Sequence, residues 1–232
     1  MDSQMKQLAY GVLVKQRKAC TLCDSQQCEL QNPSIAFSGK YDTNEIGHWT
    51  DWQGSLNAKI MVIGQDWGDI GTLEKQGGEC NVDNSATNRA LMKLIQIAGV
   101  DVNENNFRNQ HPDLFFTNAI LCMKSDGGLA GKVKGPWFRN CVNSFLKPLL
   151  ELIQPKIAVT LGEKATKSLL REYGHKGISF RNLVEQESPI IVGANTAVFP
   201  VFHCGSLGQR NRSFELQKGD WLRIRRYLEL DD

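Results

Sequence analysis

Four short apolar runs in the chain have the length of buried β-strands. They cover residues 59–64, 114–121, 156–162 and 197–203. The first run ends abruptly at Gly64, which is typical of a buried strand that delivers the following residues to the edge of a sheet. We therefore expect the four runs to be strands of one sheet.

Helical patterns fill most of the intervals between these runs. Ser85 is a good helix-capping residue, and Gly99 stops the apolar stripe that follows it. Further helices are expected at residues 3–18, at 137–153, directly after Gly162, and at 219–230. Pro148 should kink or interrupt the helix in which it falls, because proline cannot donate a backbone hydrogen bond. The apolar face of the N-terminal helix carries Leu8, Val12 and Met5.

Strands that alternate with helices predict an α/β fold. We expect three α/β/α layers with a central, mainly parallel four-stranded sheet. Residues 178–192 would add either a short helix or an edge hairpin. Neither a low-complexity linker nor an internal repeat interrupts the chain, so we expect one domain over residues 1–232.

Composition limits the class of protein further. The 232 residues are 41% hydrophobic and 22% charged, with a formal net charge of +2, as in an ordinary globular protein. The charge alone does not indicate a nucleic-acid-binding protein. No apolar run approaches the roughly 18 to 20 residues that span a bilayer, and the N-terminus does not resemble a secretory signal. We expect a cytoplasmic monomer with no membrane partner.

Polar side chains follow the strands at the edge where parallel strands would end. Asp66 comes directly after the first strand, Asn118 lies near the end of the second, and His203 ends the fourth. Alone, each has an ordinary structural explanation as a helix cap, a turn residue or a core histidine. Ligands of open α/β sheets bind at the carboxyl ends of the strands. Their convergence there predicts a catalytic or binding site.

The same segments resemble the uracil-DNA glycosylase superfamily, and its iron–sulfur branch, family 4, most of all. That branch has a Gly-Glu-Ala-Pro-Gly motif after the first strand, Thr-Asn at the second, Leu-Gly with a following alanine at the third, and His-Pro-Ser near the end. This chain has Gly-Gln-Asp-Trp-Gly at 64–68, Thr-Asn at 117–118, Leu-Gly at 161–162 with Ala165, and His-Cys-Gly-Ser at 203–206. The first motif is closer to the Gly-Gln-Asp-Pro-Tyr of family 1.

The resemblance implies an enzyme that removes uracil or a related deaminated base from DNA. It makes Asp66 and His203 the catalytic residues. Asp66 would stabilise the sugar cation and orient water, and His203 would donate to the base oxygen. Base-binding positions would be Gly64, Gln65, Trp67 and Asn118.

The resemblance also implies DNA contacts in the loop after His203. Leu207 would be a wedge that fills the space left by the flipped base, while Ser206, Arg210 and Arg212 would contact phosphates. A second basic group comprises Lys124, Lys132, Lys134 and Arg139. Without the family, both groups would be read as ordinary solvated loops.

Seven cysteines, an odd number, favour thiolate or metal chemistry over a disulfide framework. The family's four-iron, four-sulfur cluster would be held here by Cys20, Cys23, Cys122 and Cys141. Zinc would accept the same sulfurs, and Cys28 could replace one ligand. Cys80 and Cys204 would be free thiols. Cys204 cannot pair with the adjacent His203, because neighbours in an extended chain point to opposite faces, so we expect it to be buried.

Departures from the family pattern leave the base open. Trp67 replaces the proline of the first motif, and Cys204-Gly205 replaces the proline of the last. Between Gly68 and Ala90 the chain has no phenylalanine, tyrosine or further tryptophan to stack on uracil. Either Trp67 stacks on the base, or the base is not uracil. Two alternatives follow. One is a protein of the same fold that binds nucleic acid or a nucleobase without cleavage. The other is a metal-dependent nucleotide hydrolase, which would depend on further acidic residues such as Asp69 and Glu74.

Overall fold

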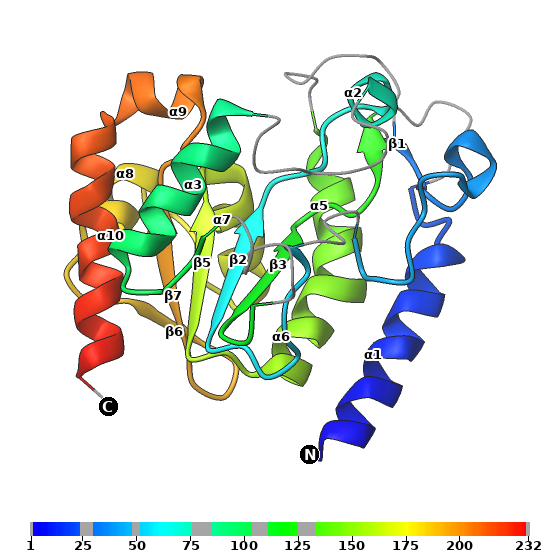
Figure 1. The fold of residues 1–232 in the computed structure, drawn as a ribbon, viewed down its shortest axis with the longest axis horizontal. Coiled ribbons are helices and arrows are strands. Elements are labelled where there is room, and N and C mark those ends of the chain that lie inside the picture. Colours follow the sequence, from blue (N-terminus) through cyan, green and yellow to red (C-terminus); the bar gives the residue numbers. More distant parts are fainter. Residues whose placement is uncertain are drawn as a thin grey trace.

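A computed structural model describes residues 2–23, 30–47, 52–75, 85–103, 111–124 and 133–230. Its central feature is a five-stranded sheet with the strand order β3-β2-β5-β7-β6 (Figure 1). The bounds of these strands are β2 Ile60–Gly64, β3 Leu114–Asn118, β5 Ile157–Leu161, β6 Ile190–Val192 and β7 Thr196–Val201. The predicted three-layer, mainly parallel α/β fold is confirmed, but the prediction of four strands was wrong.

The extra strand is β6, which pairs antiparallel with β7 at the edge of the sheet. Its register places Ile191 opposite Ala197. The segment before it forms helix α8, Phe180–Glu185. Residues 178–192 therefore supply both the short helix and the hairpin, which the sequence had offered as alternatives. The apolar pattern of β6 covers only three residues, with one of them exposed, so it is too short to stand out in the sequence.

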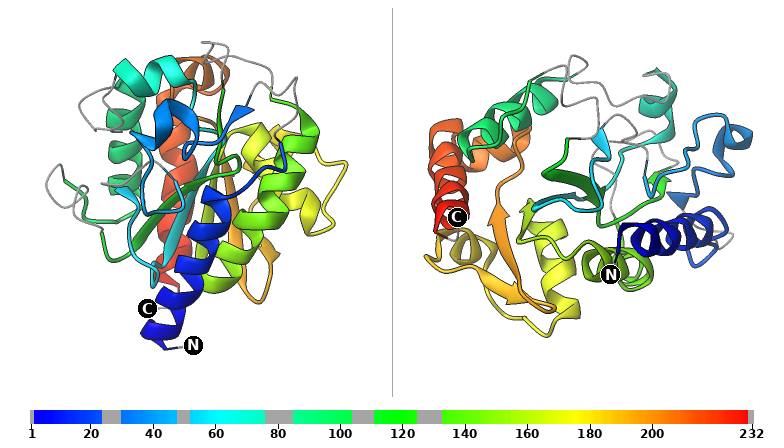
Figure 2. Two further views of the ribbon diagram at one scale, coloured as in Figure 1. Left: turned by 90° about the vertical axis from the view of Figure 1, so that its right-hand side faces the viewer. Right: turned by 60° about the horizontal axis from the view of Figure 1, so that its bottom comes forward.

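Successive residues of the parallel strands point into two separate cores. Met61, Ile63 and Phe115 belong to one core, which also includes side chains of helices on that face. Ile60 and Val62 belong to the other core. Because neighbouring strand residues point to opposite faces, this alternation covers both faces of the sheet. Helices α3 (Ala86–Ile97) and α10 (Phe214–Glu229) lie on one side. The other side carries α1 (Ser3–Lys18), α5 (Gly135–Cys141), α6 (Lys147–Ile153) and α7 (Glu163–Glu172) (Figure 2).

Helix α1 has the predicted bounds, but the face expected to be apolar and inward is exposed. Met5, Leu8 and Val12 lie in solvent, whereas Tyr10 and Val14 are buried. Polar contacts select this orientation. The Tyr10 hydroxyl donates to Oε2 of Glu45 at 2.6 Å, and the buried Arg17 pairs with Asp42 at 2.6 Å.

The predicted helix over residues 137–153 is interrupted, as Pro148 requires. Its middle part is a π-helical segment, η4 (Val142–Leu146), between α5 and α6. Helix α10 begins at Phe214, five residues before the predicted start, because the Ser213 side chain accepts a hydrogen bond from Leu216 N. Strand β3 ends at Asn118, although the following residues 119–121 remain buried, and the apolar run alone did not show this end.

Short elements complete the described chain. Strands β1 (Leu30–Gln31) and β4 (Met123–Lys124) form a small antiparallel sheet in which Leu30 lies opposite Lys124. The remaining helices are the 3-10 helix η1 (Ala36–Gly39), α2 (Ile70–Lys75) and α9 (Ser206–Asn211). Within the described residues, no helix is both long and apolar enough to cross a membrane.

Candidate active site

The carboxyl ends of β2, β3, β5 and β7 meet at the edge of the sheet that carries α2 and α9 (Figure 1). Gly64 lies opposite Asn118 in the β2–β3 register. Where β5 and β7 end, Gly162 N donates to Val201 O at 2.7 Å. A Cβ atom at position 162 would lie 3.5 Å from Cβ of His203. The topology therefore brings Asp66, Asn118 and His203 to one edge, as the sequence predicted.

Asn118 has a buried amide with unused hydrogen-bonding capacity. The residue is only 1% exposed. Among the described residues, neither Oδ1 nor Nδ2 has a hydrogen-bond partner. A Cβ atom at position 64 would lie 2.1 Å from Oδ1 of Asn118, so only glycine leaves room for the amide. Buried polar atoms normally have partners, and an amide without them can still accept and donate to a ligand.

The Asp66 carboxylate is held by three donors and is only 7% exposed. Oδ1 accepts from Gly68 N at 2.9 Å and lies 3.4 Å from Nζ of Lys124. Oδ2 accepts from Nε2 of Gln65 at 2.7 Å. Gly68 has φ +85°, a conformation that favours glycine, and this turn brings its N–H back to the carboxylate. Gln65 therefore orients Asp66.

Lys124 is not part of a solvated basic loop, which corrects the sequence interpretation. It is 2% exposed and forms an ion pair with Asp66. Its position follows from β4, whose pairing with β1 buries residue 124 beside the turn at Gly68, where Lys124 N donates to Gly68 O. A strand of two residues has no recognisable periodicity, so β4 could not be predicted from the sequence. Lys132 of the same predicted group lies outside the described residues.

His203 is neutral and carries its proton on Nε2. The backbone N–H of Gly205 donates to Nδ1 at 3.0 Å. Because Nδ1 accepts, the hydrogen of the neutral ring must be on Nε2. Burial lowers the pKa of His203, and the negative charge of Asp66 partly opposes this. The residue nevertheless retains solvent-exposed surface, so the ring can donate from Nε2 to a ligand.

A comparison with known protein families identifies the family of the chain. A model of the uracil DNA glycosylase superfamily matches residues 52–230. The chain belongs to this superfamily. The match contains Asp66, Asn118 and His203, and it begins after α1. No curated protein matches the chain.

Trp67, a predicted base-binding residue of this uracil DNA glycosylase superfamily member, packs toward the N-terminal segment. A Cβ atom at position 47 would lie 2.1 Å from Cζ2 of Trp67, so the indole lies directly over Gly47. It also packs against the small apolar cluster of Ala36, Leu73 and Met123. Its indole therefore helps to attach the N-terminal segment to the strand-end motif.

The superfamily acts on DNA, and the loop after β7 presents three of the four predicted DNA-contacting residues. Ser206, Leu207 and Arg210 are exposed on α9, with Leu207 66% exposed. A Cβ atom at position 208 would lie 1.7 Å from His203 O, so α9 packs directly on the backbone of the catalytic candidate.

Arg212, the fourth predicted DNA contact, is engaged within the protein. Its Nε and Nη2 donate to the two carboxylate oxygens of Asp220 at 2.6 and 2.8 Å. Nη1 lies 3.3 Å from Glu185, and the side chain is 11% exposed. Hydrogen bonds from the guanidinium to Asp220 raise the pKa of Arg212. This pairing ties the end of α9 to α10.

Cys141 belongs to one of the two cores, and the other three predicted metal ligands of this superfamily member, Cys20, Cys23 and Cys122, pack against that core. Burial raises the pKa of Cys122, and negative charge on the other three cysteines raises it further. Burial raises the pKa of Cys141 to about 12. Nδ2 of Asn140 lies 3.5 Å from Sγ of Cys23.

No three potential ligands in the described residues lie close enough together to hold one metal ion. Cys204 is fully buried apart from the group, with Sγ 3.5 Å from Thr87 O, as predicted for a small buried thiol. Cys28 and Cys80 lie outside the described residues.

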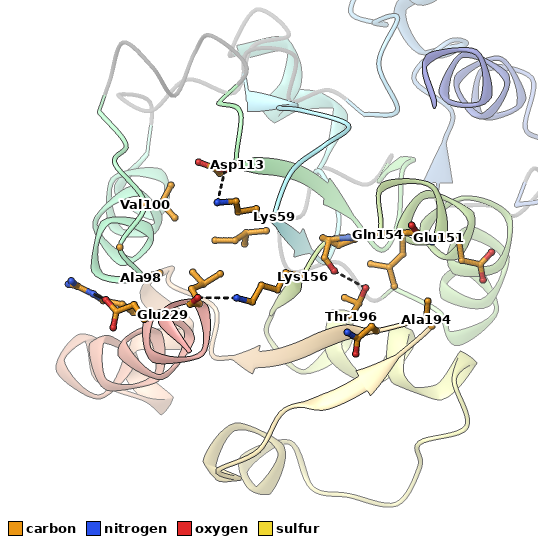
Figure 3. Close-up of a pocket in the computed structure, with 18 of the residues that line it drawn as sticks. Lys59, Ala98, Val100, Asp113, Glu151, Gln154, Lys156, Ala194, Thr196 and Glu229 are labelled. Atoms are coloured by element: carbon orange, nitrogen blue, oxygen red, sulfur yellow. Dashed lines mark hydrogen bonds and ion pairs between the residues drawn. The ribbon is translucent and has the colours of Figure 1, made fainter. Parts of the chain in front are cut away.

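A cavity of about 910 Å³ lies at the opposite edge of the sheet, by the amino ends of the strands (Figure 3). Two of its polar side chains form hydrogen bonds within the protein. Lys156 Nζ donates to Leu228 O at 2.9 Å, and Thr196 Oγ1 donates to Pro155 O at 2.9 Å. Ligands of such sheets bind at the carboxyl ends, so this cavity is not the candidate active site.

Proposed function

We propose that the protein is a DNA glycosylase that hydrolyses the N-glycosidic bond of uracil or a related deaminated base. The observation that carries this proposal is the buried Asn118 amide, which lacks a hydrogen-bond partner among the described residues and lies at the same strand edge as Asp66 and His203. A glycosylase must take the base out of the DNA stack before cleavage. The flipped base would then meet Asn118.

The Asn118 amide supports selection of uracil. Its oxygen can accept from an N–H of the base, and its nitrogen can donate to the neighbouring carbonyl. Cytosine presents the opposite pattern at these two positions. A buried amide that met cytosine would be left with an unsatisfied donor and acceptor, which costs affinity.

Bond cleavage would use Asp66 and His203 in complementary roles. When the bond between C1′ of the sugar and the base breaks, both electrons go to the base, which leaves a sugar cation. The Asp66 carboxylate stabilises this cation and orients water, which adds hydroxide to C1′ and releases a proton. His203 donates from Nε2 to the base oxygen on which negative charge develops, so a neutral imidazole suffices.

The DNA backbone would be held by α9. Leu207 is placed to enter the space that the flipped base leaves, and Ser206 and Arg210 are available for phosphates. In this proposal Arg212 is not a DNA ligand. Its pairing with Asp220 instead fixes the end of α9.

Cys20, Cys23, Cys122 and Cys141 would hold a four-iron, four-sulfur cluster, as in family 4 of the superfamily. Zinc accepts the same four sulfurs. We favour the cluster over zinc because of the resemblance to family 4. The cluster would join the N-terminal segment to α5 and to the end of β3, and it would supply structure only.

The test is release of free base from DNA that contains uracil or hypoxanthine, in single and double strands. Wild-type protein should release uracil, and Asp66→Asn and His203→Ala should each lower the single-turnover rate by about 10²- to 10⁴-fold. Absence of base release by folded, metal-loaded wild-type protein would refute the proposal.

A second candidate function is binding of nucleic acid or a nucleobase without cleavage. The placement of Trp67 favours it, because this indole packs over Gly47. In that case the protein would form a salt-sensitive complex with DNA and release no base. The two candidates are therefore separated by the same base-release assay, combined with a measurement of DNA binding.

A further inference from the structure

Lys124 lies against Asp66, the carboxylate at the centre of the proposed chemistry. Nζ lies 3.4 Å from Oδ1 of Asp66, and the two side chains are 2% and 7% exposed. An ammonium group in so buried a position requires charge compensation, and its field is little screened by solvent. Lys124 therefore acts on Asp66 more strongly than a surface lysine could.

The other groups around Asp66 differ from Lys124 in charge. Gly68 N and Nε2 of Gln65 are neutral donors. His203 is close enough for the charge of Asp66 to affect it, but burial favours its neutral form. Asp69 forms a backbone bridge with Lys124 and is itself acidic. Among the described residues, Lys124 is thus the cation paired with Asp66.

The contacts also divide the two oxygens of the carboxylate. Oδ1 faces both Gly68 N and Lys124, whereas Oδ2 accepts one hydrogen bond, from Gln65. Each carboxylate oxygen has two lone-pair positions. Oδ1 therefore faces a backbone N–H and the ammonium group, whereas Oδ2, with one hydrogen bond, keeps one position for water or for the sugar.

We propose that Lys124 is a positioning residue that holds Oδ1 of Asp66 and leaves Oδ2 for the reacting sugar. This inference rests on the proposed glycosylase function. It explains how the carboxylate is oriented, and it identifies the oxygen that acts. Lys124 reaches this position because the pairing of β4 with β1 buries it.

The test compares Lys124→Met, Lys124→Arg and a control, Lys59→Met. Methionine keeps an unbranched chain without the charge, and arginine keeps the charge. Lys59 precedes β2 at the opposite edge of the sheet and is 62% exposed. Single-turnover rate and DNA affinity are measured at neutral pH. Iron content, zinc content and thermal stability are measured as well, because Cys122 is two residues away.

We expect Lys124→Met to lower the single-turnover rate at neutral pH by about 10²-fold with unchanged DNA affinity. Lys124→Arg should restore most of the rate, and Lys59→Met should behave as wild type. A Lys124→Met variant with the wild-type rate, or a Lys124→Arg variant as slow as Lys124→Met, would overturn the inference.

A second measurement does not depend on base release. The carboxyl carbon resonance of Asp66, assigned with Asp66→Asn, reports the surroundings of this group. At neutral pH it should move in Lys124→Met and stay in place in Lys59→Met. An unchanged resonance in Lys124→Met would reject the role of Lys124, whereas inactive wild-type protein with a moved resonance would reject only the glycosylase function.

Discussion

The amide of Asn118 occupies the space that any side chain at position 64 would need. A Cβ atom on Gly64 would lie 2.1 Å from Oδ1 of Asn118, and the two residues are partners in the β2–β3 register. The pairing of two strands thus fixes the position of the group proposed to select the base. It also makes the contribution of Gly64 measurable.

Gly64→Ala should displace the Asn118 amide. We expect the rate of base release to fall by about 10²-fold and the free energy of unfolding to fall by about 1 to 3 kcal/mol from overpacking. Single-turnover kinetics and chemical denaturation would measure the two effects.

The control is the same substitution in an Asn118→Ala background. Asn118→Ala alone should abolish selection of the base at little cost in stability, because its amide makes no hydrogen bond among the described residues. Gly64→Ala should then cost much less stability than in wild type. Equal costs in both backgrounds would contradict the steric explanation.

Gly205→Pro should remove the hydrogen bond that fixes the tautomer of His203. Gly205 has φ −70°, which proline can adopt, but proline lacks the N–H that donates to Nδ1 of His203. We expect a lower single-turnover rate than in Gly205→Ala, by about 10²-fold. Alanine is the matched control because it adds a Cβ atom and keeps the N–H. Equal rates for the two variants would show that this hydrogen bond does not fix the active tautomer.

His203 should make stability depend on pH. Burial lowers its pKa in the folded protein, whereas an unfolded histidine has a pKa of about 6.5. Below about pH 6.5 the unfolded chain binds the proton more readily, so the free energy of unfolding should fall as pH falls. Denaturation of wild type and His203→Asn between about pH 8 and about pH 5 would test this. The variant should lose less stability, and parallel curves would argue against a neutral imidazole in the folded protein.

Leu207→Ala should affect double-stranded substrates more than single-stranded ones. A wedge is needed only where a base leaves a stacked duplex. The exposed side chain implies little change in stability. Leu216→Ala is the control, because Leu216 is also exposed but lies on α10. Equal losses on both substrates would exclude a wedge.

The two arginines near α9 should behave differently. Arg210→Ala should weaken DNA binding and reduce the salt dependence of the affinity by about one phosphate contact, with stability unchanged. Arg212→Ala should instead lower stability by about 3 kcal/mol, because it leaves the buried Asp220 without its bidentate partner. If Arg210→Ala left the salt dependence unchanged, its phosphate contact would be excluded.

Removal of one proposed cluster ligand should remove the metal. Wild-type protein purified without oxygen should contain about four irons per chain and absorb broadly in the visible range. Cys122→Ser should lose iron and stability, whereas Cys204→Ser should keep the iron, since Cys204 lies apart from the group. Colourless wild-type protein with one zinc would replace the cluster with a zinc site.

The strand-end residues were predictable because they follow long, apolar strands. Asp66, Asn118 and His203 needed only the rule that parallel strands end together. Lys124 was not predictable, because a two-residue pairing with a distant segment determines its burial. The role of Arg212 depends on Asp220, one helix further on. In α1, the polar partners of Tyr10 and Arg17, rather than the apolar stripe, decide which face is buried.

The packing of α1 determines which truncated forms of the protein can fold. The superfamily match begins at residue 52, but Tyr10 and Val14 belong to the same core as Phe115 of β3. The Tyr10 and Phe115 rings meet edge to face at 6.2 Å, and β1 is the pairing partner of the strand that carries Lys124. A fragment limited to residues 52–230 would lack α1 and would expose the part of the core that α1 covers. It would also lack β1, one of the two strands of the small sheet that buries Lys124 beside Asp66. The minimal unit for expression therefore extends upstream of the segment that homology delimits.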